Sequence, residues 1–400
     1  MNKQIFFFLM LSFFQSAYST NNLKKLYSRS IDVDESQCKM MSKELLDELD
    51  QLPKSIDHDG KLSSSKSSWW TSGFFPGTLW LLYEATGDEE IRKYAEEYTK
   101  RVEVEQYTTS NHDVGFMIYC SVGNSERLVP DKNKRDILMN AAKSLSTRYR
   151  KLNGCIQSWN IEDWNKNRGW QCPVIIDNMM NLELLMWAYK NSGNAIYKNI
   201  ACSHADITLK NQFRDNSSCY HVVSYDTING MPHYKGTHQG YSDESVWARG
   251  QAWAIYGFTM MYRETKNDEY LKQAIRTADY IINHPSFPID GIPYWDFDDP
   301  QIPLAERDAS AAAIMSSALF ELCNYVSDKK KHNVYLEVAL KQIKALSSPV
   351  YLSAPGENCG FILKHSVGNY PGNSEIDVPL TYADYYYVEA LLRMKNLFGL

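Results

Sequence analysis

Two aspartates stand directly before strongly apolar stretches, and they are the residues best suited to acid–base chemistry. Asp113 follows His112 and precedes VGFMIYCSVG, and Asp177 precedes NMMNLELLMWAY. Two carboxyl groups that share a partly dry cavity acquire different pKa values, so one can hold a proton while the other stays charged. Such a pair can act as general acid and base. The alternative is that each aspartate only caps the helix that follows it.

A third chemically active group is Arg249, which lies inside the apolar stretch VWARGQAW. A buried guanidinium without a partner is costly, so it must meet a carboxylate of the protein or of a ligand. Asp243 and Glu244 are the structural candidates, and bidentate binding of a substrate carboxylate is the functional one. Further donors for the same anion are available at Gln239, His221 and His238.

Ten tryptophans could supply flat faces for sugar rings, although at least half of them should belong to the core. The candidates for a binding surface are Trp69, Trp70, Trp159, Trp164 and Trp247.

Composition and motifs exclude several classes of function. The 400 residues carry 42 Lys plus Arg against 48 Asp plus Glu, a net charge of -6, and the basic residues are scattered, so nucleic-acid binding is not expected. No G-x-S-x-G, HExxH, P-loop or GxGxxG motif supports serine-hydrolase, zinc-protease or nucleotide chemistry. The eight cysteines contain no CxxC pair, so zinc is not indicated.

Two kinds of predicted helix must position these residues. One kind has a single apolar stripe and suits a solvent-facing ring. It covers residues 35–51, 88–104, 132–149, 194–213, 267–284 and 329–347. The other kind is apolar on every side and must be buried. Its segments begin at Gly73, Val114, Asn178, Val246, Ala309 and Tyr382.

The alternation of six buried and six exposed helices, joined by short turns, predicts an all-α fold, an (α/α)6 barrel. An α-solenoid is the alternative. Residues 220–236 alternate apolar and polar side chains around Asn229-Gly230, which predicts a small β-hairpin. Because the inner helices of such a barrel run parallel, the polar segments that precede them should surround one cavity.

The N-terminus has the pattern of a secretory signal. Lys3 precedes an apolar run over residues 5–14, and small residues follow at Ser16 and Ala17. This run is too short to span a bilayer, and no other stretch reaches the required length. We expect residues 1–19 to be a signal peptide, residues 20–400 to form a single barrel domain, and the protein to be periplasmic or secreted.

Several long motifs resemble the unsaturated glucuronyl hydrolases, glycoside hydrolase family 88. They run from about Trp69 to the C-terminus: NHDVGFMIYCSVGN, VIIDNMMNLELLMWA, GTHQGYSDESVWARGQAWAIYGF, YWDFD, RDASAAAI and KHSVGNYPGNSEIDVPLTYADYYYVEALLR. The resemblance implies an (α/α)6 barrel that needs no metal or organic cofactor. Its substrate would be the 4,5-unsaturated uronic acid at the non-reducing end of lyase-generated glycosaminoglycan oligosaccharides.

The same resemblance implies the chemistry and the residues. Hydration of the C4=C5 vinyl ether produces a hemiketal that opens and expels the sugar. Asp177 is then the general acid/base, kept protonated near neutral pH by burial beside a charged Asp113, the second essential carboxylate. The substrate-binding residues implied are His112, His221, Gln239, Arg249, Trp70 and Trp159.

Two alternatives stay open from the sequence. An unsaturated rhamnogalacturonyl hydrolase would share the barrel and the chemistry but act on pectin fragments. A carbohydrate-binding toroid that has lost catalysis would bind sugars without turnover. Candidates for recognising the leaving sugar are Lys364, Ser366 and Ser374.

Overall fold

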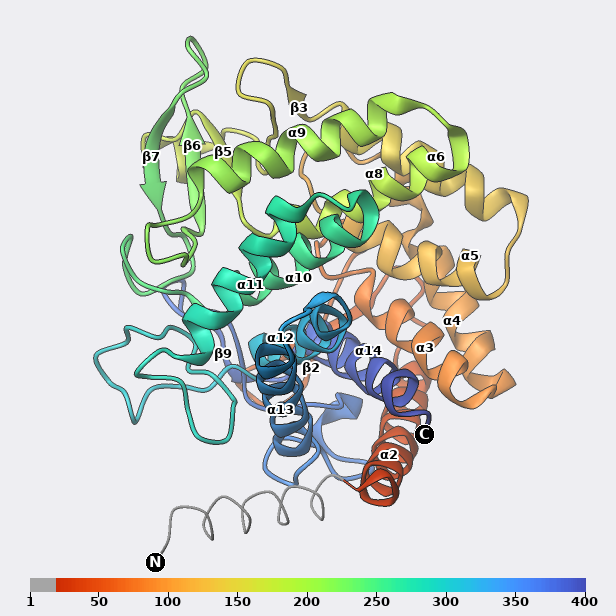
Figure 1. Ribbon diagram of the computed structural model, residues 1–400. Coiled ribbons are helices and arrows are strands. Elements are labelled where there is room, and N and C mark those ends of the chain that lie inside the picture. The colour runs from red at the N-terminus through yellow and green to blue at the C-terminus, as the bar shows by residue number, and fades with distance from the viewer. Residues whose placement is uncertain (1–18) are drawn as a thin grey trace, which may run out of the picture.

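The helices of the computed structural model, which describes residues 19–400, form two concentric rings (Figure 1). The inner ring consists of α3 (Phe74–Thr86), the π-helix η2 (Gly115–Gly123) with its continuation α5 (Asn124–Leu128), α8 (Asn178–Ser192), α10 (Ala248–Thr265), α12 (Ala309–Leu322) and α14 (Thr381–Phe398). The outer ring consists of α2 (Thr20–Glu44), α4 (Glu89–Val102), α6 (Lys132–Ser146), α9 (Ala195–Asn211), α11 (Asp268–Ile282) and α13 (Lys329–Leu346).

The ring closes because α14, the last helix, packs against both α12 and α3. Its C-terminal end lies beside α2 in Figure 1. The expected (α/α)6 barrel is therefore confirmed, and the α-solenoid alternative is wrong, since the first and last helices of a solenoid do not meet.

Burial separates the two rings as the apolar patterns predict. Every residue of the inner helix α12 is buried. The outer helix α11 buries one stripe at helical spacing, which includes Tyr270, Ala274, Ala278 and Ile281. The barrel is thus held together by inner helices that have no solvent-facing side.

The first helix differs from its prediction. We expected a helix over residues 35–51, but α2 runs from Thr20 to Glu44 with Ser19 as its N-cap. Leu23, Tyr27 and Ile31 recur every four residues in its first half and are buried, so this half packs on the barrel despite its many charges. The chain leaves the helix before residue 51 because the next segment forms a strand.

The chain also forms small antiparallel sheets between the barrel helices. They pair β1 (Leu52–Ile56) with β2 (Leu62–Ser65), β3 (Tyr149–Arg150) with β4 (Cys155–Ile156), and β8 (Ser366–Asn369) with β9 (Ser374–Val378). The predicted hairpin is confirmed as β6 (Val222–Tyr225) and β7 (Pro232–Gly236), and β5 (Cys172–Ile175) adds a third strand to it. The shorter helical turns are η1 (Glu103–Tyr107), α7 (Asp163–Lys166), η3 (Cys323–Tyr325) and η4 (Asn358–Gly360).

Within residues 19–400, no helix combines the length and the apolar character needed to cross a bilayer. The expected signal peptide, residues 1–19, lies outside the described residues except for Ser19.

Candidate active site

A cavity of about 500 Å³ opens where the inner helices begin. Its walls include Trp70 before α3, Asp113 before η2, Asp177 before α8, Gln239 before α10 and Tyr382 in the first turn of α14. The structure thus brings together polar segments that are far apart in the sequence, as the barrel predicts.

Ser158 links the segments that carry the two aspartates. Its carbonyl oxygen accepts a hydrogen bond from the backbone N–H of His112 (3.1 Å), and its Oγ accepts one from that of Ile175 (3.0 Å). His112 is the neighbour of Asp113, and Ile175 ends the strand that leads to Asp177. One buried serine therefore fixes the distance between the two acidic segments.

The three-stranded sheet places His221 beside Asp177. Ile175 pairs with Val222 across β5 and β6, and the backbone N–H of Ile176 donates to the carbonyl of His221 (3.0 Å). As a result, Nε2 of His221 lies 3.7 Å from Oδ2 of Asp177. The strand β5, which the sequence patterns did not reveal, is what makes this pair.

His112 stands beside Asp113 in a similar way, with Nε2 3.3 Å from Oδ1 of the aspartate. The side-chain oxygen of Asn181 already accepts from the backbone N–H of Phe116 (2.9 Å), so its amide group donates to Nδ1 of His112 (3.4 Å). The ring hydrogen of His112 then lies on Nε2 and faces Asp113. Burial lowers the pKa of His112 to about 3, so the ring is neutral.

His221 has the same tautomer for a different reason. Its Nδ1 accepts hydrogen bonds from the backbone N–H groups of His238 and Gln239, both at 3.2 Å, which leaves the ring hydrogen on Nε2. Burial lowers the pKa of His221 well below its ordinary value. Neither Nε2 makes a hydrogen bond within residues 19–400. Two neutral donors therefore lie next to the two carboxyl groups, His112 in the cavity wall and His221 behind it.

The capping alternative for the aspartates is wrong. The side chain of Asp177 makes no capping hydrogen bond to α8, and none is made at the start of η2, which follows Asp113. Oδ2 of Asp177 is buried and accepts no hydrogen bond from the described residues. Both carboxyl groups are therefore free for chemistry.

Burial raises the pKa of both carboxyl groups. The pKa of Asp113 rises to about 8, with a further contribution from the charge of Asp177. The pKa of Asp177 also rises through burial, but only to about 6, because the Arg249 guanidinium favours its charged form. We expected Asp177 to be the protonated member and Asp113 the charged one. In the structure Asp113 has the higher pKa, because the positive charge of Arg249 acts on Asp177 and the negative charge of Asp177 acts on Asp113. The pKa of Asp177 still lies above its ordinary range, so this carboxyl group can hold a proton at mildly acidic pH.

Arg249 is buried and lies behind the cavity wall. Its Nη2 donates to the carbonyl of Gly368 (2.7 Å), and its Nη1 donates to the carbonyl of Val367 and lies 3.4 Å from Oδ2 of Asp308. We expected Asp243 or Glu244 as the structural partner of Arg249, and this was wrong. Asp308, which precedes α12, takes their place. Direct binding of a substrate carboxylate by Arg249 stays a prediction.

Gly368 connects Arg249 to the cavity. This residue of β8 lines the cavity, and its carbonyl also accepts a hydrogen bond from Nε2 of Gln239 (3.1 Å). Arg249 and Gln239 thus hold the β8–β9 hairpin against the mouth of the barrel.

Four of the five candidate tryptophans line the cavity: Trp69, Trp70, Trp159 and Trp164. The fifth, Trp247, is buried, and its ring centroid lies 4.3 Å from that of His221. Trp70 lies against Tyr382 with 5.0 Å between ring centroids. Aromatic faces on both sides of the acidic pair suit a sugar ring.

Two charged residues of the cavity escaped the sequence analysis. Lys54 of β1 and Glu375 of β9 line it, with Nζ of Lys54 3.2 Å from Oε1 of Glu375 and 4.4 Å from the ring centroid of Trp69. Lys54 is the one lysine or arginine among the described residues that line this cavity. No motif marks either residue, because short hairpins bring them there.

Of the candidates for reading the leaving sugar, only Ser374 lines the cavity. Lys364 points elsewhere and donates to the carbonyl of Pro349 (2.8 Å), and Ser366 is fully buried in β8.

An (α/α)6 barrel with paired, buried carboxyl groups and aromatic walls at its mouth is typical of a carbohydrate-cleaving hydrolase. A family model described as Glycosyl Hydrolase Family 88 matches residues 41–399. The chain therefore belongs to this family and is a glycoside hydrolase.

Several relatives are similar over most of the chain. An unsaturated glucuronyl hydrolase of Formosa agariphila is 51% identical over 329 residues, which are 82% of this chain and 80% of the relative. The crystal structure of an unsaturated glucuronyl hydrolase specific for heparin is 44% identical, with a TM-score of 0.90 over 94% of this chain and 98% of the other. That of Bacillus sp. GL1, described as responsible for the degradation of glycosaminoglycan, is 31% identical, with a TM-score of 0.85 over 92% and 97%.

Proposed function

We propose that this enzyme removes the 4,5-unsaturated uronic acid from the non-reducing end of lyase-generated glycosaminoglycan oligosaccharides. The observation that carries the proposal is the pair Asp113 and Asp177, uncapped, buried and in one cavity of sugar size. The relatives named above are unsaturated glucuronyl hydrolases, and that of Bacillus sp. GL1 is described as responsible for the degradation of glycosaminoglycan.

The reaction begins with a proton transfer from Asp177 to C4 of the unsaturated ring. Asp177 lines the cavity, and no described residue donates a hydrogen bond to its Oδ2, so the carboxyl group can hold the proton that the substrate receives. Positive charge then develops at C5 beside the ring oxygen. Water adds to C5 and returns a proton to Asp177, so the enzyme is regenerated and one water is consumed. The hemiketal opens and releases the leaving sugar.

The remaining polar groups hold the substrate. The Nε2–H groups of His112 and His221 lack partners among residues 19–400, as does the buried hydroxyl of Tyr382. Each can donate to a ring hydroxyl or to the uronate. An unsatisfied buried donor is costly, so a substrate that pairs with it is favoured over one that does not.

We further propose that heparin fragments are the preferred substrates. The relative with a TM-score of 0.90 is described as specific for heparin. Lys54 lies beside Trp69, and although Glu375 shares its charge, it is the one lysine or arginine of the described cavity wall that an anionic group of the leaving sugar can meet.

The test is a panel of unsaturated disaccharides from heparin, chondroitin and hyaluronan, with rhamnogalacturonan disaccharides in parallel. Loss of the ultraviolet absorbance of the double bond reports turnover. The proposal predicts turnover of the glycosaminoglycan set, with heparin fragments fastest. Turnover of pectin fragments alone would support the rhamnogalacturonyl alternative, and binding without turnover would support a carbohydrate-binding toroid.

We also propose that the protein is exported through a signal peptide. The support is the sequence pattern of residues 1–19, a basic residue followed by an apolar run and small residues. N-terminal sequencing of protein recovered from the periplasm or the medium should give a first residue near Thr20. Cytoplasmic protein that keeps its N-terminal apolar run would contradict the proposal.

A further inference from the structure

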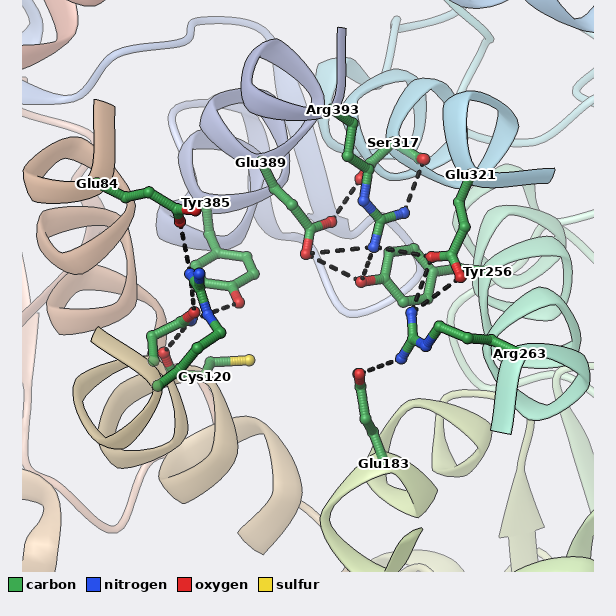
Figure 2. A network of polar contacts seen from close by, with 12 residues as sticks. Glu84, Cys120, Glu183, Tyr256, Arg263, Ser317, Glu321, Tyr385, Glu389 and Arg393 are labelled. Atoms are coloured by element: carbon green, nitrogen blue, oxygen red, sulfur yellow. Dashed lines mark hydrogen bonds and ion pairs between the residues drawn. The ribbon is translucent and has the colours of Figure 1, made fainter. Parts of the chain in front are cut away.

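A second cavity, of about 430 Å³, lies where the inner helices end, at the opposite end of the barrel from the aspartate pair. Glu183 of α8, Arg263 of α10, and Glu389 and Arg393 of α14 line it. Figure 2 shows these side chains directed toward one another in a polar network. The reaction proposed above uses none of them.

The network contains more carboxylates than cations. Its carboxylates are Glu183, Glu264, Glu321 and Glu389, and its cations are Lys190, Arg263 and Arg393, four against three. The remaining charged residues of the cavity wall are balanced, since Arg127 pairs with Glu84 (2.6 Å) and Glu126 pairs with Arg135 (2.8 Å). One negative charge is therefore left uncompensated.

Glu183 is the least compensated of the four carboxylates. Its Oε1 accepts a hydrogen bond from Nη2 of Arg263. The same guanidinium also donates to Glu321 through Nη1 and to Glu264 through Nε. The other oxygen of Glu183 makes no hydrogen bond or ion pair within residues 19–400, and the residue belongs to the cavity wall. Burial and the three neighbouring carboxylates raise its pKa, as expected for a carboxylate that lacks a full partner.

A tyrosine in the wall of the same cavity also lacks a hydrogen-bond partner. Tyr386 lines the cavity and is only 2% exposed, and its hydroxyl makes no hydrogen bond within the described part of the chain. Tyr119, Trp187 and Tyr256 add aromatic faces to the wall. Aromatic faces favour cations, and an unpaired hydroxyl in a cavity wall can bond to a ligand.

We propose that this cavity binds a small organic cation, an amino sugar with a free protonated amine, whose ammonium group meets Glu183 and whose hydroxyl groups meet Tyr386. An ammonium group supplies the missing positive charge and is attracted to the aromatic walls. Among residues 19–400 no group of three or more His, Cys, Asp or Glu side chains is arranged to hold a metal ion, which favours an ammonium over a metal cation.

Calorimetric titration with glucosamine near neutral pH, where most of its amine is protonated and Glu183 is more ionised than at acidic pH, tests the proposal. N-acetylglucosamine has the same ring without the charge and should bind at least tenfold more weakly. Glu183→Gln should weaken glucosamine binding at least about tenfold, because it removes a charge-assisted hydrogen bond. Tyr386→Phe should weaken it about threefold, as expected for one neutral hydrogen bond.

Two control variants locate the site. Glu48→Gln removes an exposed carboxylate on the turn after α2 and should leave binding unchanged. Asp177→Asn changes the catalytic cavity and should also leave glucosamine binding unchanged. Loss of binding in Asp177→Asn but not in Glu183→Gln would place the amino sugar in the catalytic cavity and overturn the proposal.

Two further results would overturn it: equal binding of the two sugars, or full binding by Glu183→Gln. That variant should fold, because Arg263 keeps Glu264 and Glu321 as partners. If it does not fold, Tyr386→Phe decides the question, since its lost hydroxyl bonds no described residue of the protein. Unchanged glucosamine affinity in Tyr386→Phe would then contradict the site.

Discussion

Nε2 of His221 lies 3.7 Å from Oδ2 of Asp177, and both side chains are buried at the mouth of the barrel. The ring hydrogen of His221 points to this gap because Nδ1 accepts two backbone N–H groups. A gap of 3.7 Å is too long for a hydrogen bond. The donor is therefore unpaired next to the catalytic carboxyl group, behind the residues that line the cavity, and we propose that it meets a substrate bound there.

Replacement of this donor should reduce activity without large effects on the fold. We expect His221→Gln to lower kcat/KM for an unsaturated disaccharide about tenfold to a hundredfold, because a buried hydrogen bond to the substrate is lost. Continuous absorbance assays on the variant and on the native enzyme measure this. Unchanged kcat/KM would show that His221 does not contact the substrate.

The pH dependence of kcat/KM should follow Asp177. The reaction needs its protonated form, and burial raises its pKa to about 6, so the active form is lost as the pH rises through that value. Above about pH 6, log kcat/KM should fall by about one unit per pH unit. A profile that stays flat to about pH 8 would mean that Asp177 is not the proton donor.

Lys54 should determine how much a negative charge on the leaving sugar contributes to kcat/KM. Lys54→Met removes the lysine charge from the cavity and should lower kcat/KM for sulfated disaccharides about tenfold relative to unsulfated ones. Lys66→Met is a matched control, because Lys66 is 73% exposed and does not line the cavity. An unchanged ratio in the Lys54 variant would show that the lysine does not read that charge.

Stability should depend on a buried carboxyl group far from the active site. Asp34 of α2 is fully buried, neither of its oxygens has a hydrogen-bond partner within residues 19–400, and burial raises its pKa well above the ordinary value. Because the folded pKa is the higher one, the free energy of unfolding falls once the pH rises above the unfolded pKa of about 4.

Asp34→Asn should remove this loss. Between about pH 4 and pH 8 the native protein should lose stability more steeply than the variant, by up to about 1.4 kcal/mol per pH unit while the folded group stays protonated. Urea unfolding at several pH values measures the slopes. The neighbouring Asp384, whose pKa burial raises to about 8, interacts with Asp34, so the difference between the two slopes reports Asp34 together with this interaction. Parallel slopes would contradict the assignment.

The sequence predicted the barrel well because inner and outer helices differ in how apolar residues are distributed around them, which the sequence shows directly. A helix apolar on all sides, such as α12, has no stable place except the inside. The first half of α2 was missed because charged residues lie between Leu23, Tyr27 and Ile31. That these three side chains form one buried face becomes clear only when the helix packs on the barrel.

The site was predicted in part for a similar reason. Asp113 and Asp177 could be found because each precedes a buried helix, and the barrel then places both at one mouth. Lys54 and Glu375 could not be found, since two short hairpins bring them together and no local pattern encodes their contact. The partner of Arg249 was also missed, because Asp308 lies on the next inner helix and not on a nearby segment.

In the proposed reaction Asp177 supplies the proton to the double bond. Asp177→Asn keeps the shape of the side chain but cannot donate this proton, and it should lower kcat at least about a hundredfold while circular dichroism and the melting temperature stay close to those of the native enzyme. Loss of absorbance of a heparin-derived unsaturated disaccharide measures kcat directly. A folded Asp177→Asn enzyme that turns over this substrate at near-native rate would contradict the account.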